Sequence, residues 1–72
     1  MKTQTETATR EASADWINYL LLGVTSGFAD ANDLANCQKW AVLVARSGWK
    51  IVGAARTSDG LAVFRLERSV QS

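Results

Sequence analysis

The feature that most constrains the fold of this chain is Asp59-Gly60, which lies between two segments of alternating apolar and polar residues, 49–56 and 61–67. Asp-Gly suits the two central positions of a type I′ turn, because both of those positions need positive φ. The sequence therefore predicts an antiparallel β-hairpin with a two-residue loop. In that register residue 58 faces 61, 56 faces 63, 55 faces 64 and 53 faces 66.

This register predicts one apolar and one polar face for the hairpin. The apolar face carries Trp49, Ile51, Gly53, Ala55, Ala62, Phe64 and Leu66. The opposite face carries Lys50, Val52, Arg56, Val63, Arg65 and Glu67. A two-stranded hairpin alone is marginally stable in water, so we expect its apolar face to pack on helices.

A first helix is predicted over residues 14–25. Ser13 can cap it, and apolar residues follow at i, i+3, i+4 and i+7. These residues are Ile17, Leu20, Leu21 and Val24.

A second helical segment follows. Asp30 or Asn32 offers its N-cap, and Gly48 can end it. Its apolar residues at helical spacing are Leu34, Cys37, Ala41 and Val44. The sequence leaves open whether residues 26–47 form one helix or two.

The predicted fold is α+β, with two or three helices packed on a C-terminal antiparallel β-hairpin, in a winged-helix-like or an α-α-β-β arrangement. Residues 1–12 are threonine-rich and lack apolar periodicity, which predicts a flexible N-terminal tail. Residues 13–69 then form a single small domain, because 72 residues have room for only one core. A core in this size range contributes only about 3–5 kcal/mol, so a homodimer is a further expectation.

Catalysis, metal binding and cofactors find no support in the sequence. The chain has one cysteine and no histidine, so neither an internal disulfide nor a metal site is expected. The usual general base near neutral pH is missing, and Cys37 falls at a core-facing helical position. We therefore predict a non-enzymatic protein with no catalytic residue and no cofactor.

No apolar run approaches the length of about 18 residues that a membrane span needs, so no membrane partner is expected. A lone cysteine suits a reducing compartment, which predicts a cytoplasmic protein.

Basic residues are concentrated in the second half of the chain. Residues 1–37 hold two basic and five acidic residues, whereas residues 38–72 hold six basic and two acidic ones. This asymmetry predicts that the C-terminal half faces an anionic partner. Lys39 and Arg46 share one face of the second helix, close to the amides of Asn36 and Gln38. Such a helix can read base edges while basic residues of the hairpin hold phosphates.

The segment "LVARSGWKI", followed by a hairpin that ends in "AVFRL", resembles the winged helix-turn-helix domains of phage and mobile-element proteins. The residues that carry the likeness are Leu43, Gly48, Trp49, Ile51, Phe64, Arg65 and Leu66. "INYLLLG" at 17–23 is similar to the first helix of such domains, so the likeness spans about residues 17–66. It implies a dimeric transcription regulator that binds double-stranded DNA. The implied DNA-binding residues are Asn36, Gln38, Lys39, Arg46, Lys50, Arg56 and Arg65.

A second function stays open, because a net charge of +1 is low for a DNA-binding module. Every residue from Trp40 to Ala45 is apolar, so Trp40, Val42 and Leu43 can form a contact surface for another protein. On this interpretation the chain is a protein-binding accessory or inhibitor protein of a phage or mobile element. It would act through the apolar helix face or the hairpin edge.

Overall fold

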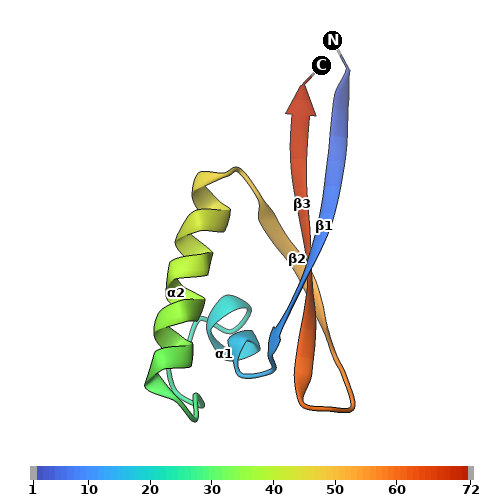
Figure 1. Ribbon diagram of the computed structural model, residues 1–72. Coiled ribbons are helices and arrows are strands. Elements are labelled where there is room, and N and C mark those ends of the chain that lie inside the picture. The colour runs from blue at the N-terminus through green and yellow to red at the C-terminus, as the bar shows by residue number, and fades with distance from the viewer. Residues whose placement is uncertain (1, 72) are drawn as a thin grey trace.

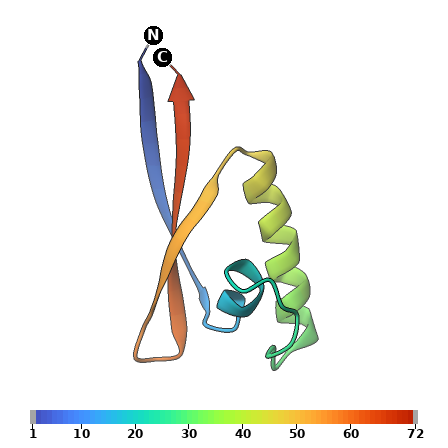
Figure 2. The ribbon, with the colours of Figure 1, turned by 180° about the vertical axis from the view of Figure 1, so that it is seen from behind.

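The computed structural model describes residues 2–71 and has an α+β fold, as predicted. The elements follow in the order β1 (Thr3–Ser13), α1 (Trp16–Leu20), α2 (Ala31–Arg46), β2 (Lys50–Arg56) and β3 (Leu61–Gln71). The three strands form one antiparallel sheet in the order β1-β3-β2, so the last strand lies in the centre. Both helices lie on the same face of this sheet (Figures 1 and 2).

The prediction of a flexible tail over residues 1–12 is wrong for residues 3–12, which belong to β1; Met1 lies outside the described residues. β1 pairs with β3 without interruption, from Thr3 opposite Gln71 to Ser13 opposite Leu61. Most of its side chains are exposed and polar, so main-chain hydrogen bonds to β3 hold it rather than burial. Threonine is favourable in such an exposed strand because its β-branched side chain fits the pleated backbone.

The first helix is much shorter than the predicted span of 14–25. After Leu20 the chain turns, and Gly23 adopts a φ of 71° that a regular helix does not allow. The Leu22 amide donates to the carbonyl of Ile17 at 3.3 Å, which closes the helix end. Ile17 and Leu20 still pack against the core, whereas Leu21 and Val24 are exposed.

The second helical segment is one continuous helix, α2, which answers the question that the sequence left open. Asp30 is its N-cap, and its carboxylate accepts a hydrogen bond from the Asn32 amide at 2.9 Å. Gly48, at a φ of 79°, follows the helix end as predicted. Within residues 2–71, neither helix has the length and apolar character needed to cross a bilayer.

The hairpin turns where predicted, but its loop and its register differ from the prediction. Gly60 has a φ of 82°, whereas Asp59 does not adopt the positive φ that a type I′ turn requires. The Thr57 amide donates to the Leu61 carbonyl at 2.9 Å, so the loop consists of residues 58–60. A three-residue loop that ends in a left-handed glycine is a common hairpin connection. The predicted pairs are therefore wrong by one residue.

This shift changes which residues of β2 share a face with the helices. Ala54 rather than Ala55 lies opposite Phe64, and Arg56 lies opposite Ala62. The register shifts again between Ile51 and Gly53, so that Ile51 faces Leu66 and Gly53 faces Arg65. Arg56 and Arg65 therefore lie on opposite faces of the sheet, not on one face as predicted. The alternation within β3 is confirmed: Phe64 and Leu66 are buried, and Arg65 is exposed.

The core is formed by a few aromatic and small side chains between the helices and β3. Its buried residues are Trp16, Cys37, Val44, Ala62, Phe64 and Leu66. The Trp40 ring lies between those of Trp16 and Phe64, with centroid distances of 5.7 and 6.3 Å. The Trp16 indole N–H donates to the Asp33 carboxylate at 2.9 Å, so its polar atom is satisfied. Two of the three tryptophans are thus core residues.

Candidate functional site

The outer face of α2 brings together most of the site residues predicted on that helix. Val42 and Leu43 are 51% and 61% exposed. Lys39 and Arg46, both exposed, lie one helical turn before and after this pair, because residues three or four apart share a helix face. We call these four residues the α2 surface. Asn36 and Gln38 are exposed one turn before Lys39 and Val42.

Trp40 does not belong to this surface, contrary to the prediction that grouped it with Val42 and Leu43. It lies on the inner side of α2, half-buried against Trp16 and Phe64. The reason is the helical period of 100° per residue, which places residue 40 on the side of the buried residues 37 and 44. A run of apolar residues on a helix is therefore divided between the core and the solvent.

The three predicted basic residues of the hairpin are exposed but do not meet in one place. Lys50 and Arg56 lie at opposite ends of β2, and Arg65 lies on the other face of the sheet from Arg56. The Arg65 side chain lies over Gly53, and its Nη2 is 3.2 Å from the position that a Cβ there would occupy. Together with Lys39 and Arg46, these residues are distributed around the molecule.

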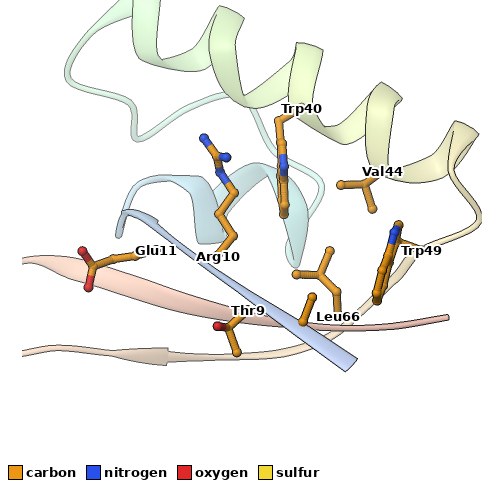
Figure 3. Close-up of a pocket in the computed structure, with 8 residues that line it drawn as sticks. Thr9, Arg10, Glu11, Trp40, Val44, Trp49 and Leu66 are labelled. Carbon is orange, nitrogen blue, oxygen red and sulfur yellow. The ribbon is translucent and has the colours of Figure 1, made fainter. Parts of the chain in front are cut away.

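Two grooves separate the C-terminal half of α2 from the sheet. The β1 groove, of about 490 Å³, is lined by Ala8, Thr9, Arg10, Glu11, Trp40, Val44, Trp49 and Leu66. The β2 groove, also about 490 Å³, is lined by Tyr19, Leu20, Gly23, Ala41, Val44, Ala45, Trp49 and Ile51. Val44 and Trp49 line both grooves and form the partition between them. In Figure 3, Trp40 and Val44 project from α2 toward Leu66, with Arg10 beside the Trp40 ring.

Arg10 is a residue that the sequence analysis missed, because it lay in the presumed tail. Its guanidinium carbon lies 5.4 Å from the ring centroid of Trp16 and 5.2 Å from that of Trp40. At these distances the cation is attracted to both aromatic rings. The only sequence signal was the small apolar residue two positions to either side, Ala8 and Ala12, which marks the inward-facing positions of β1.

The segment between the helices adds a second group of exposed apolar side chains, of which Leu21 and Val24 were predicted to lie on an apolar helix face. Leu21, Leu22 and Val24 are 44%, 66% and 41% exposed. Gly23, which lies between Leu22 and Val24 in the sequence, lines the β2 groove. The β2 groove is thus bordered by α2 on one side and by Tyr19, Leu20 and Gly23 on another.

Cys37 is fully buried, and its reactivity is suppressed by its surroundings. Burial and the nearby Asp33 carboxylate raise the pKa of the Cys37 thiol to about 11. At the hairpin tip, a hydrogen bond from the Thr57 hydroxyl lowers the pKa of Asp59, and backbone amides contribute to the same shift. Among the described residues, no three histidine, cysteine, aspartate or glutamate side chains gather in a group that could hold a metal. The features of the described residues that could bind a partner are the α2 surface and the two grooves.

Cys37 in the folded chain is expected to react with iodoacetamide at about pH 8 at least about 100-fold more slowly than in the unfolded chain. Its pKa of about 11, against an ordinary value of 9.0, leaves about 100-fold less thiolate, and burial blocks access as well. Mass spectrometry of samples quenched over time, with and without guanidinium, measures both rates. Equal rates would mean that Cys37 is accessible in the native state.

Comparison of the chain with models of known protein families, with curated proteins and with solved structures finds no match.

Proposed function

We propose that this chain is a small non-catalytic protein-binding module whose contact surface is the α2 surface. The observation that carries the proposal is the exposure of Val42 and Leu43, side by side and flanked by two cations. The core does not use them, because the opposite side of α2 contributes Cys37 and Val44. A contiguous group of exposed aliphatic side chains with a polar rim is typical of an interaction site.

The charges and the apolar side chains of the α2 surface indicate which kind of partner it fits. Among the described residues, neither Lys39 nor Arg46 takes part in an ion pair within the chain. Their charges are therefore available to acidic side chains, while Val42 and Leu43 offer an apolar contact between them. The partner that fits is a protein segment with an apolar anchor beside aspartate or glutamate residues. Cys37 is a free, buried thiol, which supports placing this module in the reducing cytoplasm.

A photo-reactive amino acid in place of Leu43 is expected to cross-link one discrete protein in a lysate of the source cell. Val42→Asp, tested with competing unlabelled protein, should weaken that capture about tenfold or more, because it puts a charge into a desolvated apolar contact. Val52→Asp is the matched control, since Val52 has similar exposure, 43%, but lies on β2, away from the α2 surface. Equal competition by Val42→Asp and the unmodified chain would eliminate the α2 surface as the contact site.

DNA binding is the second candidate function that we propose, and one observation favours it. Asn36, Lys39 and Arg46 are all exposed on α2, which could present an amide and two cations to a major groove. Arg56, on the helix-covered face of the sheet, would then supply a phosphate contact. Lys50 and Arg65 would not reach the same duplex, because both lie on the other face of the sheet: Lys50 is opposite Glu67, which shares its face with Arg65. A helix-turn-helix has a short helix before its recognition helix, whereas α2 is one continuous helix. This difference weakens the winged-helix interpretation.

Three phosphate contacts, by Lys39, Arg46 and Arg56, predict a salt slope of about −2.7 on a double-logarithmic plot, or about 40-fold weaker DNA binding at 200 mM than at 50 mM salt. Fluorescence anisotropy with a random duplex measures this slope. Lys39→Glu should reduce binding and Arg65→Glu should not. No binding at the lower salt concentration would remove this candidate and leave the first.

A further inference from the structure

β1 presents a long main-chain edge to the solvent. Its other edge is paired with β3 along the whole strand, from Thr3 to Ser13. The Ala14 amide donates to the Gly60 carbonyl of the opposing strand at 3.2 Å, and main-chain groups alternate in direction along a strand. Even-numbered residues of β1 therefore bond to β3. Odd-numbered residues direct their N–H and C=O groups to the open edge.

Of the features that usually prevent edge strands from pairing, β1 has inward-pointing charges, Glu6 and Arg10, but it lacks the others. Natural edge strands carry a proline, a bulge or a covering element. The chain has no proline, and the pairing of β1 with β3 is free of bulges. Figures 1 and 2 show that the ribbon of β1 and β3 also extends beyond the end of α2. The edge is thus a regular template for a further strand.

We propose that two copies of the chain pair in antiparallel orientation through their β1 edges, about a two-fold axis at Ala8, to form a six-stranded sheet. Ala8 is the central residue of Thr3–Ser13, so every residue of β1 gains a partner. Thr7 then exchanges main-chain hydrogen bonds with the partner's Thr9, and Glu6 lies opposite the partner's Arg10. Both pairs occur twice by symmetry.

The charges on β1 select this register from the alternatives. The odd-numbered residues of β1 carry the main-chain groups at the open edge, so they must pair with odd-numbered residues of the partner strand. In a two-fold arrangement this requires the axis to pass through a residue of β1. An axis at Thr7 or Thr9 pairs only nine residues and sets no opposite charges against each other. An axis at Glu6 or Arg10 sets that charge against its own copy. Among these registers, the axis at Ala8 alone pairs both charges favourably, and opposite charges directly across two strands stabilise a sheet.

The contacts already present in one chain extend into this arrangement. Arg68 of β3 donates to Glu6, with Nη2 and Oε1 2.5 Å apart, so the partner's Arg10 would complete a row of alternating charge across three strands. The antiparallel orientation also sets the projecting ribbon of one copy beside the helices of the other. Both helical layers then lie on the same face of the six-stranded sheet, and the two β1 grooves meet near the axis.

The chain is expected to sediment at twice its monomer mass of 7.8 kDa, and Thr7→Pro is expected to make it monomeric. Proline at residue 7 removes an N–H that points to the open edge, while the hydrogen bonds between β1 and β3 remain. Thr7→Ala is the matched control and should stay dimeric. Circular dichroism checks that each variant folds. A wild-type chain that is monomeric up to about 1 mM would overturn the proposal and leave the edge to a strand of another protein.

Cysteine and charge-reversal variants keep the test independent of how proline is tolerated. Ala8→Cys should form a disulfide-linked dimer under mild oxidation, because the two copies of residue 8 lie opposite one another; Thr7→Cys, opposite the partner's Thr9, should not. Arg10→Glu should weaken dimerisation about tenfold by setting it against the partner's Glu6. The double variant with Arg10→Glu and Glu6→Arg exchanges the two charges, so it should dimerise more tightly than the variant with Glu6→Arg alone. Cross-linking at residue 7 instead of residue 8, or no restoration, would refute this register.

Discussion

Deletion of residues 2–12 is expected to unfold the chain. These residues form nearly all of β1, whose pairs with β3 run the full length of the central strand. The deletion also removes Ala12 from its packing against the core, and Arg10 from its position over Trp16 and Trp40. What remains is a two-stranded hairpin under two helices, and such a sheet is marginal in water. Loss of the cooperative thermal transition, followed by circular dichroism, is the expected result.

Deletion of residues 2–5 is the matched control. Thr3, Gln4 and Thr5 pair with residues 69–71, beyond the point where β2 begins at Lys50 opposite Glu67. The shorter deletion should therefore keep a cooperative transition, with Tm lower by about 4–8 °C for each kcal/mol lost. A sharp transition in the chain that lacks residues 2–12 would show that this segment is a dispensable tail, as its composition suggests.

Phe64→Ala is expected to lower the free energy of unfolding by about 3–5 kcal/mol. Phe64 is fully buried on β3, the central strand of the sheet, and its ring centroid is 6.3 Å from that of Trp40. A chain of this length has about 4–11 kcal/mol of stability in total, so this one cavity removes a large fraction of it. Urea denaturation followed by tryptophan fluorescence measures the loss.

Val63→Ala, one residue away, should cost only about 1 kcal/mol. Val63 is half-buried on the face of the sheet that the helices do not cover. The difference between the two variants tests the face assignment of β3 directly. Equal losses would mean that both faces of the strand contribute to packing.

The hairpin shows which part of a strand can be predicted from local sequence. The alternation of Phe64 and Leu66 with Arg65 fixes the faces of β3, because one buried face requires it whatever the loop. The register of β2 was predicted wrongly because it depends on a small difference between loop types. In the structure the Thr57 hydroxyl accepts a hydrogen bond from the Leu61 amide at 3.2 Å, which supports the three-residue loop.

The exposed apolar residues of the candidate site also show that local sequence patterns predict only part of the structure. Trp40, Val42 and Leu43 were predicted to share one contact surface, but only Val42 and Leu43 are exposed, while Trp40 packs in the core. Leu21 and Val24 fitted the periodicity of a buried helix face, yet Gly23 ends that geometry and leaves them exposed. Periodicity predicts where a helix is able to bury side chains, and the actual helix length decides which of them it does bury.

The sequence by itself determined the helix end before Gly48 and the inward face of β3, because helix ends and alternation are local properties. It left open whether the segment before Gly48 was one helix and whether Asp30 or Asn32 capped it. The tertiary structure alone decided that residues 3–13 are a strand. That segment has almost no apolar pattern, and its conformation depends on hydrogen bonds to the far end of the chain. Those bonds also create the groove around Arg10 and the open edge through which we expect two copies to meet.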